Sequence, residues 1–286
     1  MPDDQPHPTS PAGVAPDYLR AVRDKYNVIQ IWPESDRWLA HVKAWIAEAI
    51  ADWRPRLALT PAARVLNAGS GDESYGLAPG LVIDCDIADR KLVGLKLGVA
   101  GDLANLPLAK DAVDVCVCVG SVINYVGDVE RAVGEIARVL RPDGRLILEF
   151  ESSRSGEYHF TPHFGRDAAR VRTFYIDQDE SIWVFNEAYV RRVLAAHGFA
   201  VVDERRAHFL SPFVYRFGKD LNRAARYAAF DRWVGRLPFF RTRSANVILL
   251  CERRPGGNGL NGGNGLNGAN GARINGLNGN GAAHGG

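Results

Sequence analysis

A short glycine-containing turn and a later acidic residue carry the clearest chemical signal in this sequence of 286 residues. An apolar run at 64–66 leads into Asn67, Gly69 and Gly71, and glycines let a backbone turn tightly and approach a ligand without obstruction by Cβ. Asp86 ends the next apolar run, where a carboxylate can accept hydrogen bonds from the hydroxyl pair of a ribose. These residues predict a site for a cofactor that contains a nucleoside.

Phosphate-binding versions of such a turn are less consistent with the sequence. The third glycine of a G-x-G-x-x-G motif would fall at position 74, which is Ser74. No Gly-Lys-Ser/Thr follows the turn either, which excludes a P-loop. A plain structural turn beside a solvated Asp86 is the alternative to a cofactor site.

The elements that must position this turn alternate between strand and helix. Apolar runs predict strands, and apolar residues at helical spacing between capping residues predict helices. The first expected strand is the apolar run at 64–71, which ends in glycines, and the others are 81–86, 113–119, 145–150, 199–202 and 245–251. The expected helices are 38–53, 128–140 and 187–197. Such alternation with nearly continuous apolar strands predicts an α/β fold, a doubly wound, mostly parallel sheet covered on both faces. Ligands bind at the carboxyl ends of such strands.

Composition narrows the class of protein. The chain has 35 basic and 33 acidic residues, a formal charge of +2, and 46% hydrophobic residues, which argues against a dedicated nucleic-acid binder. No apolar run approaches the roughly 20 residues that span a bilayer, and four cysteines in apolar runs suggest a reducing compartment. We therefore expect a cytoplasmic protein without a metal site. The cysteines are Cys85, Cys116, Cys118 and Cys251.

The two ends of the chain differ from the rest in composition. Residues 1–16 contain five prolines, and residues 256–286 contain 13 of the 30 glycines and eight asparagines. Such segments bury too little apolar surface to offset the entropy of ordering. Both are predicted to be disordered tails (1–16 and 255–286) around one folded domain at 17–254, with N-terminal helices at 17–59, a cofactor-binding half at 60–151 and an acceptor-side half at 152–254.

The order and spacing of several motifs resemble the class I S-adenosylmethionine-dependent methyltransferases, of the methyltransferase 11 type, over about residues 60–203. The motifs are Val-Leu-Asn-Ala-Gly-Ser-Gly (65–71), Ile-Asp-Cys-Asp-Ile (83–87), Gly-Asp-Leu-Ala-Asn-Leu-Pro-Leu (101–108), Asp-Ala-Val-Asp-Val (111–115) and Arg-Val-Leu-Arg-Pro-Asp-Gly-Arg-Leu-Ile (138–147). The resemblance implies a Rossmann-like sheet of seven strands, mostly parallel with the last strand antiparallel, and S-adenosyl-L-methionine as the cofactor.

The resemblance also implies a role for each matching residue. Gly69 and Gly71 would line the methionine part of the cofactor, and Gly120 would lie near the sulfonium. Asp86 would bind the ribose, with Asp84 as its rival. The adenine would contact Ile87, Asp102 and Leu103.

Three features depart from the family pattern. Asn67 stands where the family usually has an acidic residue, so one negative charge near the cationic cofactor is missing. Its amide can still form hydrogen bonds, so we expect Asn67 to contact the cofactor and the binding to be weakened or re-routed. Residues 72–80 are too few and too rich in Gly and Pro for the usual helix, and 88–100 leave little room for the next one. We expect the sheet to be thinly covered on that side.

Two inserts are candidates for the acceptor side. Residues 153–185 predict a β-hairpin lid, with strands at 171–176 and 181–185, and they contain His159 and His163 as candidate general bases. Tyr125, shortly after the fourth strand, is similarly placed to touch an acceptor.

The second insert, 205–243, contains ten Lys or Arg against two Asp, a local charge of +8, on a predicted amphipathic helix with interspersed aromatic residues. This pattern fits a solvated helix face, a site for an anionic acceptor, or peripheral contact with an anionic membrane.

Taken together, the residues predict a methyltransferase acting on a small-molecule or lipid-linked acceptor, most readily at oxygen. Two alternatives remain open from the sequence: a non-catalytic S-adenosylmethionine-binding or scaffold protein, and a nucleotide-dependent oxidoreductase of the same layered architecture.

Overall fold

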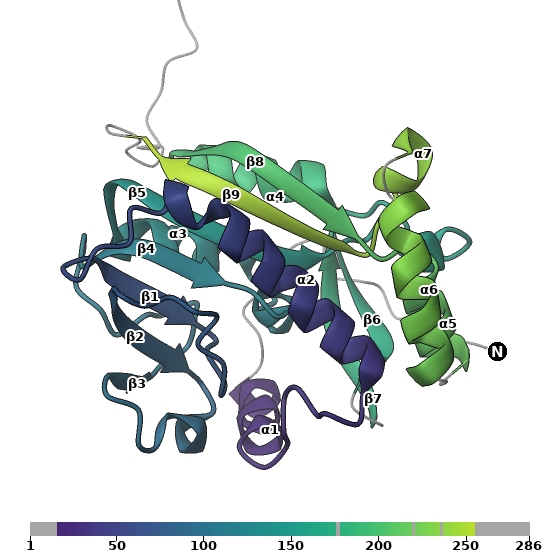
Figure 1. The fold of residues 1–286 in the computed structure, drawn as a ribbon, viewed down its shortest axis with the longest axis horizontal. Coiled ribbons are helices and arrows are strands. Elements are labelled where there is room, and N and C mark those ends of the chain that lie inside the picture. Colours follow the sequence, from purple (N-terminus) through teal and green to yellow (C-terminus); the bar gives the residue numbers. More distant parts are fainter. Residues whose placement is uncertain (1–15, 176–177, 219–220, 235–236, 255–286) are drawn as a thin grey trace, which may run out of the picture.

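A seven-stranded sheet forms the centre of the molecule in the computed structural model (Figure 1), which describes residues 16–175, 178–218, 221–234 and 237–254. The predicted disordered tails, 1–16 and 255–286, lie outside these residues, apart from Pro16. The strands of the sheet are β1 (Arg64–Ala68), β2 (Leu81–Asp86), β3 (Gly98–Ala100), β4 (Val113–Cys118), β5 (Leu140–Glu151), β8 (Phe199–Ala207) and β9 (Asn246–Arg253).

The strand order is β3-β2-β1-β4-β5-β9-β8. β1, β2, β3, β4 and β5 pair in parallel, whereas β9 runs antiparallel to both of its neighbours. The predicted mostly parallel sheet with an antiparallel last strand is therefore confirmed. β5 begins at Leu140, earlier than predicted, because Leu140 pairs with Val113 of β4. The next pair is Arg145 with Val115, so the predicted turn around Pro142 is an unpaired irregularity within the strand, with Asp143 at a φ of +63°.

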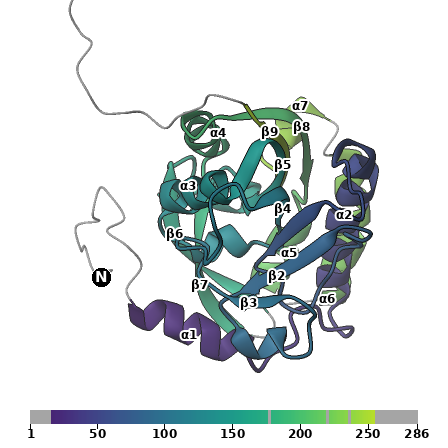
Figure 2. The ribbon, with the colours of Figure 1, turned by 90° about the vertical axis from the view of Figure 1, so that its left-hand side faces the viewer.

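Helices cover both faces of the sheet, as Figure 2 shows. α2 (Arg37–Trp53), α5 (Ser211–Gly218) and α6 (Leu221–Val234) lie on one face, and α3 (Val129–Val139) and α4 (Glu187–Ala196) lie on the other. Asp36, Asp128 and Asn186 cap α2, α3 and α4 by accepting hydrogen bonds from backbone N–H groups of the first turn. Two apolar cores result, one on each face.

The remaining elements are short or stand apart from the main sheet. β6 (Ala168–Tyr175) and β7 (Gln178–Phe185) form a separate antiparallel hairpin, as predicted. Residues 72–80 contain no helix, and 88–100 contain only η2 (Asp89–Leu92) and β3, so the thin cover predicted there is present. The other elements are α1 (Pro16–Tyr26), η1 (Arg54–Arg56), η3 (Val122–Tyr125), η4 (Gly156–Tyr158) and α7 (Pro238–Arg241). None of the described helices is long and apolar enough to cross a bilayer.

Candidate functional site

A cavity lies at the carboxyl ends of the parallel strands, where such folds bind ligands. It encloses about 850 Å³ of space not filled by protein atoms, the open solvent at its mouth included. The residues after β1, β2, β3 and β4 form its floor and walls. From these strand ends come Gly69, Ser70, Asp86, Ile87, Gly101, Asp102, Leu103, Val119 and Gly120.

The glycine turn predicted from the sequence passes close to its neighbours. Gly69 has a φ of +70°, and a Cβ built on it would lie 2.2 Å from Val122. A Cβ on Gly71, with a φ of +52°, would lie 2.2 Å from Ile31. Any side chain at either position would therefore displace the groups that shape the cavity. Gly69 lines the cavity directly, and Gly71 supports the turn beneath Ile31.

Asp86 is the buried carboxylate of the cavity. Oδ2 accepts a hydrogen bond from the Gly71 N–H at 2.7 Å, and Oδ1 accepts one from the Ala88 N–H at 2.7 Å. Burial raises the pKa of Asp86, and these hydrogen bonds act in the opposite direction. Because a carboxylate oxygen accepts more than one hydrogen bond, Asp86 can hold the turn and still accept from a ligand. Its rival Asp84 does not line the cavity.

Asn67 does not line the cavity, contrary to the contact expected from the sequence. Its side chain is buried, and Nδ2 donates to the Glu73 carbonyl at 2.8 Å and to Asp84 Oδ1 at 2.9 Å. β1 and β2 pair in parallel with Asn67 opposite Asp84. The amide of Asn67 therefore holds the side chain of Asp84 on the neighbouring strand, and neither residue lines the cavity.

The other cofactor residues predicted by resemblance meet at one end of the cavity. Ile87, Leu103 and Leu106 provide apolar walls, and Asp102 lies beside them. The Ala104 N–H donates to Asp102 Oδ1 at 2.9 Å, which fixes the turn that carries it. This end of the cavity therefore combines apolar side chains with the carboxylate of Asp102.

A buried carboxylate supports the opposite end, and the sequence analysis missed it. Glu149 on β5 is fully buried, and its Oε2 accepts from the Ser121 N–H at 2.6 Å, directly after the cavity residue Gly120. Its Oε1 accepts from Asn246 Nδ2 at 2.8 Å, and Asn246 Oδ1 lies 2.9 Å from His208 Nδ1. Burial raises the pKa of Glu149 to about 7. A charged residue within an otherwise apolar strand was the available signal.

The N-terminal segment covers the cavity, which sequence reasoning also missed. α1 contributes Leu19, Val22 and Tyr26 to the lining, and the following loop contributes Ile31 and Trp32. This segment is here called the cover (residues 16–33).

Hydrogen bonds attach the cover at both of its sides. Tyr18 Oη donates to the Ser181 carbonyl at 3.1 Å, and Lys25 Nζ lies 2.9 Å from Glu180 Oε2, both on β7. On the other side, Asn27 Nδ2 donates to Asp89 Oδ1 at 3.0 Å, and Lys91 Nζ donates to the Ile29 carbonyl at 2.7 Å. The cover thus bridges the hairpin and η2.

Of the three predicted catalytic residues, the structure brings only Tyr125 to the cavity. Its hydroxyl accepts from Tyr26 Oη at 2.6 Å and donates to Glu180 Oε2 at 3.0 Å. His159 instead packs edge-on between Phe160 and Phe164, with ring centroids 4.8 and 4.9 Å apart. His163 lies in the same loop after η4, outside the cavity lining. Neither position supports the general-base role predicted for the histidines.

Comparison with known proteins agrees with this architecture. Residues 73–148 match the family model described as a methyltransferase domain. No curated protein matches the chain.

Two solved structures illustrate the likeness of fold. One is 1,6-didemethyltoxoflavin-N1-methyltransferase of Burkholderia thailandensis, with bound 1,6-didemethyltoxoflavin and S-adenosylhomocysteine: it is 16% identical, with a TM-score of 0.52 over 88% of this chain and 100% of that one. The other is geranyl diphosphate C-methyltransferase of Streptomyces coelicolor A3(2), in complex with Mg²⁺, geranyl diphosphate and S-adenosyl-L-homocysteine: it is 12% identical, with a TM-score of 0.51 over 86% and 100%. Residues 73–148 thus match a methyltransferase domain, and the described chain shares the fold of these two methyltransferases.

Proposed function

We propose that this protein transfers a methyl group from S-adenosyl-L-methionine to an oxygen atom of a small-molecule or lipid-linked acceptor. The observation that carries the proposal is the cavity at the carboxyl ends of β1, β2 and β4, with Asp86 and Gly69 at its wall. Both solved relatives described above hold S-adenosylhomocysteine, which supports the same cofactor here.

The residues of the cavity fit this cofactor chemically. Asp86 can accept from the ribose hydroxyls, and Ile87, Leu103 and Asp102 offer apolar faces and an acceptor for an adenine. The hydroxyl of Ser70 is buried at the cavity and has no hydrogen-bond partner among the described residues. A buried polar group without a partner is costly, and a polar ligand would satisfy it.

When bound, S-adenosylmethionine supplies a methyl group on a sulfonium centre, which a nucleophile displaces in line. The work left to the protein is alignment, exclusion of water and removal of a proton from the acceptor. Trp32 and Tyr75 line the cavity beside Gly120, and Tyr26 is a further aromatic residue of the lining. Burial raises the pKa of Tyr26 well above its usual range, so this phenol stays neutral.

An oxygen acceptor is favoured by a chain of hydrogen bonds that leads away from the cavity. Tyr26 donates to Tyr125, and Tyr125 donates to Glu180, whose carboxylate also pairs with Lys25. A hydroxyl acceptor that donates to Tyr125 would pass its proton to the phenol oxygen as the phenol proton moves to Glu180. A tertiary amine or a carbon acceptor without an acidic proton at that position would not need this route.

Titration calorimetry with S-adenosylmethionine, S-adenosylhomocysteine and NAD tests the cofactor. We expect both sulfur compounds to bind and NAD not to bind; binding of NAD alone would favour the oxidoreductase alternative. Transfer of a labelled methyl group to extracted small molecules then distinguishes an enzyme from a cofactor-binding scaffold.

The oxygen acceptor is tested with Tyr125→Phe. Once the acceptor has been identified, kcat of the variant is expected to be about ten- to hundredfold lower near neutral pH, in the range of general acid–base catalysis. Cofactor affinity should remain unchanged, and the activity should recover at higher pH, where the acceptor loses its proton unaided. An unchanged kcat would refute the route through Tyr125.

A further inference from the structure

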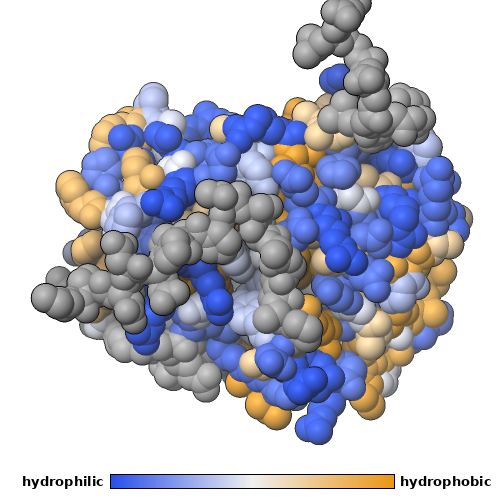
Figure 3. Space-filling view, turned by 180° about the vertical axis from the view of Figure 1, so that it is seen from behind, coloured by the Kyte–Doolittle hydropathy of each residue, from blue (hydrophilic) through white to orange (hydrophobic). Residues whose placement is uncertain are grey.

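The helices α5, α6 and α7 expose an unusual number of large apolar side chains. Figure 3 shows apolar side chains among hydrophilic ones along its left-hand edge, the side on which these helices lie. Among the described residues they are Phe213, Phe217, Phe230, Trp233, Leu237 and Phe239, each 44% to 65% exposed. We call these six residues the aromatic face. Phe213 and Phe217 form one exposed pair of rings on α5, Phe230 and Trp233 form another on α6, and the two helices pack together. Exposed apolar side chains gathered in this way on a folded domain mark a surface that binds another molecule.

α6 carries its large residues on the outer side. Ala224, Ala228 and Val234 are buried against the body of the protein. Phe230 and Trp233 point outward at 47% and 63% exposure, with ring centroids 5.9 Å apart. A helix that only covered a core would place its small residues outside and its large ones inside. The arrangement of α6 is the reverse, so core packing does not account for it.

Few acidic residues accompany the aromatic face in the insert. The insert 205–243 contains only two acidic residues, and the described one, Asp231, is 2% exposed, where it accepts from the backbone N–H groups of Phe209, Leu210 and Ser211. It therefore presents no negative charge to an approaching partner.

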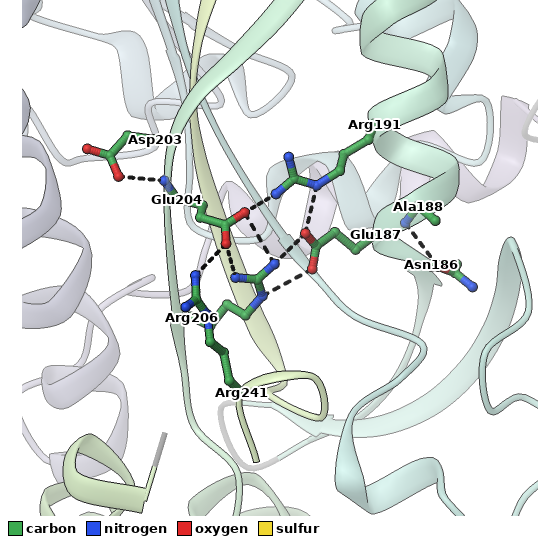
Figure 4. A network of polar contacts seen from close by, with 8 residues as sticks. All are labelled: Asn186, Glu187, Ala188, Arg191, Asp203, Glu204, Arg206 and Arg241. Atoms are coloured by element: carbon green, nitrogen blue, oxygen red, sulfur yellow. Dashed lines mark hydrogen bonds and ion pairs between the residues drawn. The ribbon is translucent and has the colours of Figure 1, made fainter. Parts of the chain in front are cut away.

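Some of the arginines of the insert form ion pairs with carboxylates. Figure 4 shows Arg206 and Arg241 on Glu204, with Arg206 also bound to Glu187, and Arg205 lies 2.5 Å from Asp52. Arg226, in contrast, is exposed on α6. It lines a groove between α2 and α6 together with Arg37 and His41, with Glu34 at the same groove. Arg226 lies one helical turn before Phe230, and the guanidinium of Arg243 lies 4.0 Å from the centre of the Phe239 ring, so cationic side chains border the aromatic face.

We propose that the aromatic face docks on the surface of an anionic lipid bilayer. Helices that bind at the membrane–water interface combine aromatic and aliphatic side chains with arginines. The rings lie at the boundary of the acyl chains, and the cations lie at the lipid phosphates. A second copy of the chain is a poorer occupant, because two copies of the same basic segment would face each other. Docking does not depend on the proposed methyl transfer.

Flotation of the full chain with vesicles tests this proposal. The vesicles are phosphatidylcholine alone, or phosphatidylcholine with about one third phosphatidylglycerol, because the attraction to basic residues depends on anionic lipid. We expect binding to the anionic vesicles that weakens as salt is added, and little binding to the neutral ones. The emission of Trp233 should shift to the blue on binding, since its indole leaves water.

Two double variants test whether vesicle binding depends on the aromatic face or on exposed apolar side chains in general. Phe230→Ser with Trp233→Ser should lower the partition coefficient at least about tenfold, the change expected when about 1.4 kcal/mol of binding is lost. Val93→Ser with Leu95→Ser removes exposed apolar side chains near the opposite edge of the sheet, 82% and 41% exposed, and should leave binding unchanged. Circular dichroism confirms that both variants are folded.

Three results would overturn the proposal. One is the absence of binding to anionic vesicles. Another is an equal loss of vesicle binding in the two double variants. The third is a chain that does not bind vesicles but sediments as a dimer, with the dimer lost only in the Phe230 and Trp233 variant. That result would assign the aromatic face to self-association.

Discussion

The buried carboxyl of Glu149 should make the stability of this protein depend on pH. Its pKa is about 7 in the folded chain against an ordinary value of 4.5, so the folded state binds the proton more tightly than the unfolded state does. Stability therefore falls as the pH rises from about 4.5 to about 7, and this contribution is constant above that pH. The difference between the two pKa values corresponds to about 3 kcal/mol.

Glu149→Gln removes this titration while keeping the shape of the side chain. The amide oxygen of a glutamine can accept from the Ser121 N–H, and its NH₂ can donate to Asn246 if that amide turns over. His208 Nδ1 would then accept from Asn246 in place of donating to it. The local hydrogen bonds survive in a neutral form.

Urea unfolding between pH 5 and pH 8 measures the effect. The wild type is expected to lose about 2.5 kcal/mol more stability over this interval than Glu149→Gln does. Glu252→Gln serves as the control, because that carboxyl is partly exposed on the surface of β9, and it should keep the wild-type slope. Identical slopes for wild type and Glu149→Gln would refute the reasoning.

The remaining predictions concern the cavity wall and the surface network. Asp86→Ala should weaken binding of S-adenosylhomocysteine by about ten- to hundredfold in calorimetry, since a hydrogen bond to a charged group contributes about 1.5–3 kcal/mol; Asp84→Ala should weaken it far less, and equal losses would contradict the assignment. Asn67→Asp should destabilise the fold by about 1–3 kcal/mol in urea unfolding, because it sets two carboxylates side by side and removes a donor, and adding Asp84→Asn should restore stability. Burial alone would raise the pKa of Glu204, but the surrounding arginines, Arg206 first, lower it to about 2; the stability this gives is present above about pH 4.5 and lost as the pH falls toward 2. Glu204→Gln should abolish that loss at a cost of about 1 kcal/mol at pH 7, after allowance for solvent screening.

Local pattern was sufficient to predict the sheet and one wall of the cavity. Gly69, Asp86 and Ile87 lie directly after apolar strands, so their sequence positions fix their place at the carboxyl edge. The helix caps at Asp36 and Asn186 are equally local, because a cap binds N–H groups two or three residues away.

Contacts between distant segments were beyond the reach of that pattern. The cover meets the cavity through contacts such as Tyr26 with Tyr125, 99 residues apart, and no periodicity encodes such a pairing. The role of Asn67 depends on its register with Asp84, which only the paired strands reveal. His159 was a reasonable candidate by residue type, yet its ring packs between two phenylalanines.

The cover also has a kinetic consequence. The sheet edge is held by strand pairing, whereas the cover is attached by side-chain hydrogen bonds and ion pairs such as those of Tyr18, Lys25 and Asn27. Segments attached in this way open at a lower free energy than the core does. Since the cover lies over part of the cavity, its opening and not the strength of binding would set how fast a ligand leaves. Salt that weakens the Lys25 pair should then shorten the residence time of a bound nucleoside more than it changes the equilibrium affinity.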